Sequence, residues 1–84
     1  MFTVYILQSV RTGRYYVGHS ADFDSRLHAH NAGKVRSTKA YAPWKVIYRE
    51  EYAAREEAYR REHEIKSYKS GAAFQELIWK SGGW

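Results

Sequence analysis

The stretch FTVYILQSVRTGRYYVGH, residues 2–19, decides the fold because it contains two short segments of strand-forming residues separated by a turn. Residues 2–7 and 15–19 are rich in aromatic and β-branched side chains, which predicts two β-strands. Thr12 and Gly13 are typical of a turn, so the strands are predicted to form an antiparallel hairpin with a loop slightly longer than the tightest type. Side chains alternate along a strand, which places Phe2, Val4 and Ile6 on one face and Thr3, Tyr5 and Leu7 on the other.

The rest of the chain alternates between helix-forming and strand-forming stretches. A helix is predicted to begin at Ser20 or Asp22, either of which can cap it, and to run to about Asn31, with Gly33 ending it. The further predicted elements are a loop over residues 34–43, a strand over 44–48 and a helix over 53–69. A last short helix follows Gly71, and residues 81–84 are predicted to be its frayed end. The order β-β-α-β-α-α indicates a small α/β (α+β) fold, in which a three-stranded, mainly antiparallel sheet is flanked by helices.

The composition limits the class of protein. The chain has 84 residues and no cysteine, so we expect a single domain over residues 1–84 without disulfides or cysteine-based metal sites. An aromatic content of 17% argues against disorder, because these side chains can build a core. The longest unbroken apolar run, Val4–Leu7, is far below the roughly 20 residues of a membrane span, and no signal peptide is visible. We therefore expect a soluble, cytoplasmic protein.

Positive charge is concentrated in the first part of the chain. The net charge is +5, but residues 1–49 carry 8 basic and 2 acidic side chains (net +6), whereas residues 50–84 carry 6 basic and 7 acidic ones (net −1). A one-sided positive field attracts polyanions such as nucleic acids. A basic protein that is merely soluble is the alternative at this point.

Glu62 lies on or beside the apolar stripe of the helix predicted over residues 53–69, and Arg61 lies close to that stripe as well. A carboxylate near a core is unfavourable unless it is paired, hydrogen-bonded or bound to a metal. Two interpretations stay open: an ion pair with an arginine across the sheet, or a role as a metal ligand or general acid/base. The stripe consists of Ala54, Ala58, Ile65 and Tyr68.

Arg26 and His30 are four residues apart on the first predicted helix and are expected to project side by side, off the stripe formed by Phe23 and Leu27. Arginine offers a fork of donors that fits a phosphate, and histidine can carry a proton near neutral pH. An ordinary solvated helix face explains the same pattern. The His28-x-His30 pair does not predict a zinc site, because residues i and i+2 of a helix do not face each other.

Tyr5 and Tyr16 lie on the two strands of the predicted hairpin and can meet on one face of the sheet. Gly18, two residues after Tyr16, shares its side of the strand and leaves a gap beside it. A glycine within a strand often marks the close approach of a ligand or of another backbone segment. Simple aromatic packing in the core is the alternative.

The motifs of the chain resemble those of the GIY-YIG nuclease superfamily. The triplet Thr3-Val4-Tyr5 and, after ten intervening residues, the triplet Tyr16-Val17-Gly18 are similar to the paired GIY and YIG motifs. The resemblance covers about residues 2–69 and is greatest to the small stand-alone members, in which the nuclease module is the entire protein. The asparagine that larger members carry after the glutamate has no clear match, since this region offers only Gln75. The other matching motifs are Asp22-x-x-x-Arg26-Leu27, His30-Asn31-x-Gly33, Thr38-Lys39, Pro43-Trp44, and Ala58-x-x-x-Glu62 with Ile65-Lys66.

The resemblance implies an endonuclease, a hydrolase of phosphodiester bonds that uses one divalent cation, Mg²⁺ or Mn²⁺, and acts on nucleic acid, DNA more often than RNA. By position, Glu62 matches the metal-binding glutamate, and Arg26 matches the arginine that stabilises charge on the scissile phosphate. Tyr5 and Tyr16 match the two tyrosines, one of which takes a proton from the attacking water, and His30 matches a position used in proton transfer. The remaining expected site residues are Gly18, which keeps the site open, and the basic side chains that would hold the nucleic-acid backbone: Arg36, Lys39, Lys45 and Arg49.

Two other functions compete with a nuclease on these residues. One is a non-catalytic nucleic-acid-binding module that retains the nuclease fold and its basic face. The other is a protein-interaction domain in which Glu62 is structural. Metal-dependent cleavage separates the first two functions, and salt-sensitive binding of DNA or RNA separates both from the third.

Overall fold

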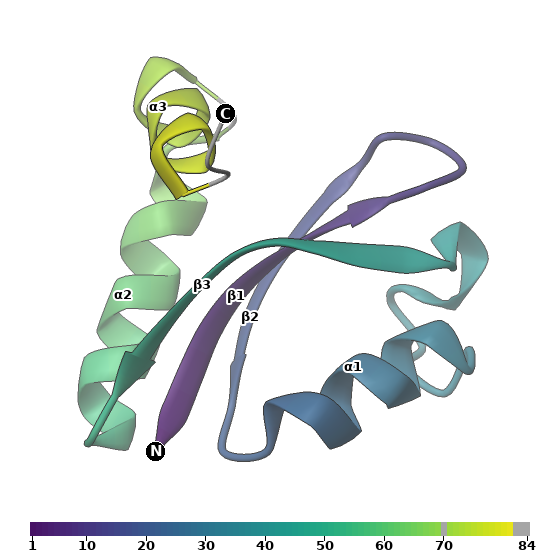
Figure 1. Ribbon diagram of the computed structural model, residues 1–84, viewed down its shortest axis with the longest axis horizontal. Helices are drawn as coiled ribbons and strands as arrows, with labels where there is room; N and C mark the ends of the chain where they lie inside the picture. The colour runs from purple at the N-terminus through teal and green to yellow at the C-terminus, as the bar shows by residue number, and fades with distance from the viewer. Residues whose placement is uncertain (70, 82–84) are drawn as a thin grey trace.

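The computed structural model describes residues 1–69 and 71–81, and Figure 1 shows a three-stranded sheet between two groups of helices. The predicted hairpin is present, since β1 (Phe2–Ser9) pairs antiparallel with β2 (Tyr15–Ser20). On its other side β1 pairs antiparallel with β3 (Trp44–Tyr52), so the strand order is β2-β1-β3 and β2 is an edge strand. The predicted α+β fold with the order β-β-α-β-α-α is confirmed.

β3 continues for four residues beyond its predicted end at Tyr48. The added residues are mostly charged, which argued against a strand in the sequence. Glu50, however, accepts hydrogen bonds from the hydroxyls of Tyr48 and Tyr52 and from the guanidinium of Arg61, which lies on a helix. Because β3 is an edge strand, its remaining charged side chains can face solvent.

The first helix, α1 (Phe23–Asn31), begins as predicted at Asp22, whose side chain accepts a hydrogen bond from the Ser25 backbone N–H. The side chain of Asn31 at its end accepts from the backbone N–H of Trp44 (2.5 Å) and donates to the carbonyl of the same residue (3.2 Å). This pair of hydrogen bonds ties α1 to the start of β3. The predicted loop between them contains a short 3₁₀ helix, η1 (Lys39–Tyr41).

The second helix, α2 (Arg55–Ser67), is two residues shorter at each end than predicted, and α3 (Ala72–Ser81) follows it. Residues 82–84, where a frayed end was expected, lie outside the described residues. None of the helices within residues 1–69 and 71–81 is long and apolar enough to cross a lipid bilayer.

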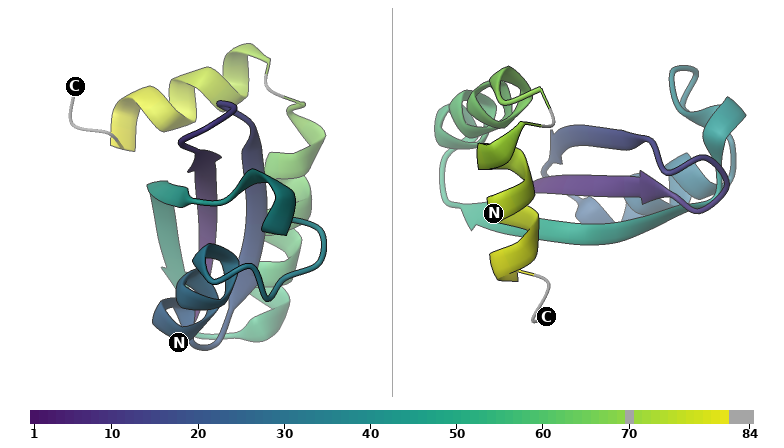
Figure 2. Two further views of the ribbon diagram at one scale, coloured as in Figure 1. Left: turned by 90° about the vertical axis from the view of Figure 1, so that its right-hand side faces the viewer. Right: turned by 90° about the horizontal axis from the view of Figure 1, so that it is seen from above.

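The sheet separates two hydrophobic clusters. α2 and α3 lie on one side of it and α1 on the other, as Figures 1 and 2 show. The alternation predicted for β1 is therefore confirmed, and this central strand contributes side chains to both clusters. Val4 and Ile6 pack with Ala58, Ile65 and Phe74, whereas Tyr5 and Leu7 pack with Phe23 and Trp44.

Candidate active site at the edge strand

Tyr5 and Tyr16 meet on the face of the sheet that carries α1. Tyr5 lies opposite Gly18 in the β1–β2 ladder, and Tyr16 precedes Gly18 by two residues, so all three share this face. The centroids of the two rings are 6.4 Å apart. A Cβ atom at position 18 would lie 2.8 Å from the Tyr5 hydroxyl oxygen and 3.0 Å from the nearest atom of the Tyr16 ring. Glycine at this position therefore allows the Tyr5 phenol to lie directly over the edge strand.

His30 is fully buried beneath the two tyrosines, which corrects the expectation that it projects off the apolar stripe of α1 beside Arg26. Phe23 and His30 are seven residues apart, about two helical turns, and both face the sheet. Arg26 is exposed. The sequence pattern misplaced His30 because a histidine was counted as polar, whereas here it belongs to the buried face.

A chain of hydrogen bonds runs inward from Tyr5. Nε2 of His30 lies 3.1 Å from the Tyr5 hydroxyl, and Nδ1 lies 2.8 Å from the Thr38 hydroxyl. The Thr38 hydroxyl donates to the carbonyl of Val35 (3.4 Å), so it accepts from Nδ1–H of His30. Nε2 is then left as an acceptor for the proton of the Tyr5 hydroxyl.

The same surroundings set the protonation of Tyr5 and His30. Burial raises the pKa of Tyr5 to about 12, the neighbouring Tyr16 phenol adds to this effect, and Arg26 opposes it. Burial, and then the positive charge of Arg26, lower the pKa of His30. At neutral pH Tyr5 therefore keeps its proton, and His30 is a neutral imidazole that can accept one.

Glu62 lies on the buried face of α2, between Ala58 and Ile65, with only 8% of its surface exposed. Its Oε1 lies 2.5 Å from Nδ1 of His19, and its Oε2 lies 2.5 Å from Nζ of Lys66. Burial opposes ionisation of Glu62, but the hydrogen bonds from Lys66 and His19 outweigh burial and hold its pKa below the usual value. Glu62 is therefore a carboxylate at neutral pH.

Glu62 does not form the ion pair with an arginine across the sheet that was one of its two interpretations, because its partners are Lys66 and His19. Arg61, the preceding residue, donates instead to Glu50 of β3 (2.9 Å) and to Glu64 (2.8 Å). Two adjacent residues of α2 thus contact different strands, since Arg61 binds Glu50 of β3 and Glu62 binds His19 of β2.

Glu62 and Tyr5 approach the edge strand from opposite faces. His19 pairs with Val4 and lies on the face that carries α2, whereas its neighbour Gly18 pairs with Tyr5 on the face that carries α1. The negative charge of Glu62 nevertheless contributes to the raised pKa of Tyr5. The carboxylate and the phenol thus lie on opposite faces of β2, and Glu62 is the weakest of the influences on the pKa of Tyr5.

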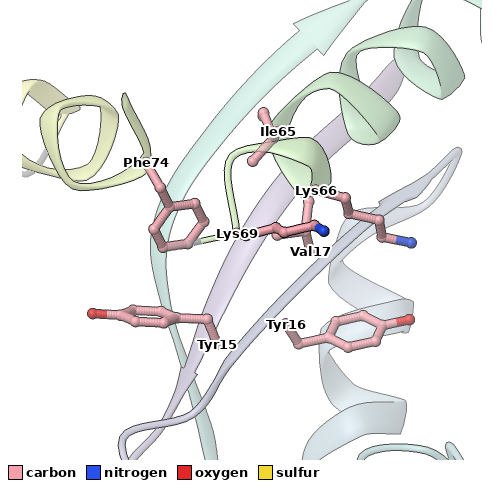
Figure 3. A pocket seen from close by; sticks show the side chains of 7 residues that line it. All are labelled: Tyr15, Tyr16, Val17, Ile65, Lys66, Lys69 and Phe74. Atoms are coloured by element: carbon pink, nitrogen blue, oxygen red, sulfur yellow. The ribbon is translucent and has the colours of Figure 1, made fainter. Parts of the chain in front are cut away.

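A pocket of about 280 Å³ lies between β2 and the C-terminal part of α2 (Figure 3). Figure 3 shows that the side chains of Tyr16 and Lys66 extend to the same side of β2. Tyr15 extends the other way, and its ring lies edge-on to that of Phe74 with centroids 4.9 Å apart. In this view the Lys66 and Tyr16 side chains extend in the same direction, although Lys66 belongs to α2 and Tyr16 lies on the face of the sheet that carries α1.

The four basic residues expected at the nucleic-acid backbone do not share one face. Arg36 and Lys39 are exposed on the loop that follows α1. Arg49 lies opposite Tyr5 in β3, and its guanidinium covers the ring of Phe23 at 4.6 Å from the centroid. Lys45 is exposed on the opposite face of the sheet, because it pairs with a residue of β1 that alternates with Tyr5.

The donor set at Glu62 fits Mg²⁺ better than an ion that requires a cage of protein ligands. In the part of the chain that the structure describes, no three His, Cys, Asp or Glu side chains gather as a metal site. Mg²⁺ is commonly bound through one or two carboxylates and keeps several of its waters. A single carboxylate that its neighbours keep ionised meets this requirement.

Sequence reasoning gave no role to two residues of the site, His19 and Lys66. Lys66 was within reach of sequence reasoning, because it follows Glu62 by one helical turn and such i,i+4 pairs face each other. His19 is 43 residues from Glu62 in the chain. Only the packing of α2 against β2 brings these two side chains together.

Two phenols, an imidazole, a guanidinium and a carboxylate thus lie around one edge strand, and side chains of these types can bind an anion and move a proton. The family model described as the GIY-YIG catalytic domain matches residues 1–73, and the chain belongs to this family. Membership implies nuclease activity, and GIY-YIG nucleases generally depend on a metal ion. The resemblance seen in the sequence motifs is thereby confirmed.

The curated relatives of the chain are UPF0213 proteins from bacteria. One from Staphylococcus epidermidis is 39% identical over 66 residues, which cover 77% of this chain and 79% of the relative. One from Streptococcus pneumoniae is 40% identical over 67 residues, which cover 79% and 67% of the two chains. A UPF0213 protein from Bacillus halodurans, solved by NMR in solution, is similar over 98% of this chain and 88% of its own length, with a TM-score of 0.60 and 31% identity. Their names state no activity.

Proposed function

We propose that this protein, as one domain over residues 1–84, is a divalent-metal-dependent endonuclease that hydrolyses phosphodiester bonds of DNA. The observation that carries the proposal is the position of Glu62 at the same strand edge as the hydrogen-bond chain from Tyr5 through His30 to Thr38. The choice of DNA over RNA rests on the resemblance to the GIY-YIG nuclease superfamily. Because the relatives are bacterial and the bacterial chromosome lies in the cytoplasm, we place the protein there.

Glu62 is the residue proposed to hold the metal ion, Mg²⁺ or Mn²⁺. When bound, such an ion polarises a phosphoryl oxygen and lowers the pKa of a coordinated water. Lys66 and His19 keep the carboxylate ionised in the absence of the ion. Each carboxylate oxygen accepts from one of these two side chains, and the lone pairs that remain are the ones that would bind the metal ion.

Tyr5 and His30 are proposed to move the proton of the attacking water. The water oxygen forms a bond to phosphorus, its proton passes to the Tyr5 oxygen, and the Tyr5 proton passes to Nε2 of His30. The hydrogen bond between Tyr5 and His30 supports this order, as does the neutral state of His30. The bond from phosphorus to the leaving oxygen breaks, this oxygen takes a proton from solvent water, and His30 returns its proton to solvent. The guanidinium of Arg26 stabilises the negative charge that develops on the phosphoryl oxygens. Tyr16 is half-buried and is proposed to orient the water from the solvent side.

The basic side chains are proposed to bind phosphates away from the reacting one. Arg36, Lys39 and Arg49 would contact the strand on the side of Tyr5. Lys45 would contact a more distant part, because it lies on the other face of the sheet. Such contacts position a nucleic acid without reading its sequence.

The deciding experiment compares the wild type with Glu62→Gln on plasmid DNA and on labelled DNA and RNA oligonucleotides, in Mg²⁺, Mn²⁺ or EDTA. We expect cleavage of DNA by the wild type in either metal ion, none in EDTA, and none by the variant. The side-chain oxygen of a glutamine at position 62 can still accept a hydrogen bond from Lys66. The free energy of unfolding of Glu62→Gln should therefore be lower than that of the wild type by no more than about 1–2 kcal/mol. Glu64→Gln, an exposed carboxylate on the same helix, is the control and should cleave normally.

Two results would contradict this proposal. Salt-sensitive binding without cleavage under any condition would identify a non-catalytic nucleic-acid-binding module. Absence of both binding and cleavage would favour a protein-interaction domain.

A further inference from the structure

A second pocket lies next to Glu62, between β2 and the N-terminal part of α2. It has a volume of about 560 Å³, which is in the range of small-ligand sites. His19 belongs to both places, since it lines this pocket and its Nδ1 binds Glu62. The pocket is lined by His19 of β2 and by five residues of α2: Arg55, Glu56, Tyr59, Arg60 and His63.

The pocket contains an aromatic side chain that the core does not use. Tyr59 is 55% exposed and belongs to neither hydrophobic cluster. Its ring lies against that of His63, with centroids 4.3 Å apart, and edge-on to that of His19 at 6.2 Å. Three ring systems therefore gather at the surface, three residues from Glu62 along α2. More than half of Tyr59 stays exposed beside these two imidazoles, which leaves ring surface on which a planar group can stack.

The charge of the pocket also suits a nucleic acid. Arg55 and Arg60 contribute two positive charges against one negative charge from Glu56. The guanidinium of Arg55 is held in place over the ring of Phe2, 4.9 Å from its centroid. Aromatic rings flanked by cations are the combination on which single-stranded nucleic acids are bound, with bases on the rings and phosphates on the cations.

We propose that this pocket binds one unpaired nucleobase of the substrate strand, stacked on Tyr59, next to the phosphodiester that is cleaved. This inference rests on the proposed function, and it narrows the substrate to nucleic acids that expose an unpaired nucleotide beside the cleavage position. In a continuous duplex each base is stacked between its neighbours, so the duplex has no exposed base face that could stack on Tyr59. Arg55 and Arg60 hold the phosphates on either side of the stacked nucleotide.

The test measures binding in EDTA, so that cleavage plays no part. The probes are a fluorescently labelled oligothymidine single strand and a blunt DNA duplex of equal length. We expect Tyr59→Ala to weaken single-strand binding about 5- to 150-fold, the range that corresponds to removal of one base–aromatic stack. Duplex affinity should stay within twofold of the wild type.

Two control variants separate stacking from other effects. Tyr59→Phe keeps the ring and should bind the single strand like the wild type. Trp79→Ala removes another exposed ring, on α3, 65% exposed, and should leave both affinities unchanged. A 2-aminopurine placed in the single strand provides a second readout, because its fluorescence is quenched by stacking in the wild type and recovers with Tyr59→Ala. Thermal unfolding of each variant shows that the fold is intact.

Several results would overturn the inference. These are unchanged single-strand binding by Tyr59→Ala, an equal loss on single strand and duplex, or a wild type that binds neither probe. The proposed function fails separately: a wild type that shows the Tyr59 effect in EDTA but cleaves nothing in Mg²⁺ or Mn²⁺ would keep the base pocket and refute the nuclease.

Discussion

Gly18 is the residue that allows the two phenols to approach each other over the edge strand. A methyl group at this position would lie 2.8 Å from the Tyr5 hydroxyl oxygen, and the Tyr16 ring closes the other side at 3.0 Å. The Tyr5 ring is fully buried between its neighbours, so it has little room to move away from an added methyl group.

Gly18→Ala should therefore lower the free energy of unfolding by about 1–3 kcal/mol, the usual cost of overpacking. The measurement is urea unfolding of Gly18→Ala, Tyr5→Phe and the double variant. Tyr5→Phe removes the closest atom, so in its background the added methyl group should cost less than in the wild type. Equal costs in both backgrounds would show that the Tyr5 oxygen is not the atom that excludes a side chain.

The variants Tyr5→Phe and Tyr16→Phe should lose activity to a similar extent but differ in their free energy of unfolding. Either change should lower turnover by about 10²–10⁴, the contribution of a positioned proton transfer. Tyr5→Phe also leaves Nε2 of His30 buried without its partner, which costs about 1–3 kcal/mol. Tyr16→Phe should be nearly neutral for stability. Single-turnover kinetics and thermal unfolding check both, and full activity in both variants would refute the proposed proton transfer.

At the scale of elements, α2 joins the two outer strands through neighbouring residues. Arg61 binds Glu50 of β3, and Glu62 binds His19 of β2. Burial opposes ionisation of Glu50, but hydrogen bonds from Arg61, Tyr48 and Tyr52 outweigh it and lower its pKa. The extension of β3 depends on this network, since it neutralises the carboxylate that faces the helix.

The network predicts a pH dependence of stability. A lowered pKa of Glu50 contributes stability that is present above its ordinary value of 4.5 and is lost as the pH falls through the folded value. Glu50→Gln should therefore destabilise the protein by about 1–3 kcal/mol at pH 7 and by much less at pH 3. Urea unfolding at both pH values measures this. Glu51→Gln, an exposed neighbour, should change stability by less than about 0.5 kcal/mol at either pH.

Local sequence patterns predicted the helices and strands. The features that these patterns did not predict depend on partners that are distant in the chain. The period of two in β1 places Tyr5 and Leu7 together, and the Asp22 cap marks the start of α1. The end of β3 was missed because the partner of Glu50 lies 11 residues further along the chain. His30 was misplaced because histidine was counted as polar, although it follows Phe23 by seven residues. Its hydrogen-bond partners, Tyr5 of β1 and Thr38 of the loop, are distant in the chain and could not be read from the helix.

At the scale of the whole molecule, the uneven charge distribution determines which part of the protein attracts a nucleic acid. The net +6 of residues 1–49 includes the exposed loop of Arg36 and Lys39 and the strand that carries Arg49. The acidic residues are mostly on β3 and α2, where several are paired within the protein. Arg49 is itself paired with Glu51 (2.9 Å), so the positive charge most accessible to phosphates is that of the exposed loop with Arg36 and Lys39.

Binding to DNA should weaken steeply as salt increases, because phosphate contacts release counterions. The double variant Arg36→Ala/Lys39→Ala should weaken binding of unrelated sequences by similar factors and reduce the dependence of log affinity on log salt by about 1–2 units. Lys45→Ala, on the other face of the sheet, should have a smaller effect. Affinity measured between 50 and 300 mM salt by fluorescence anisotropy checks this, and salt-independent binding would contradict it.

The position of the site on β2 restricts how this protein can associate with other chains. An outermost strand has unpaired backbone groups, and many proteins use such a strand to recruit a further strand from a partner. Here the same strand carries Tyr16, Gly18 and His19, and helices lie above and below it. A strand added to β2 would cover the chemistry that surrounds it. Association through this edge and the proposed catalysis thus exclude each other, and an assembly that leaves the proposed site open would form through β3 or the outer faces of the helices.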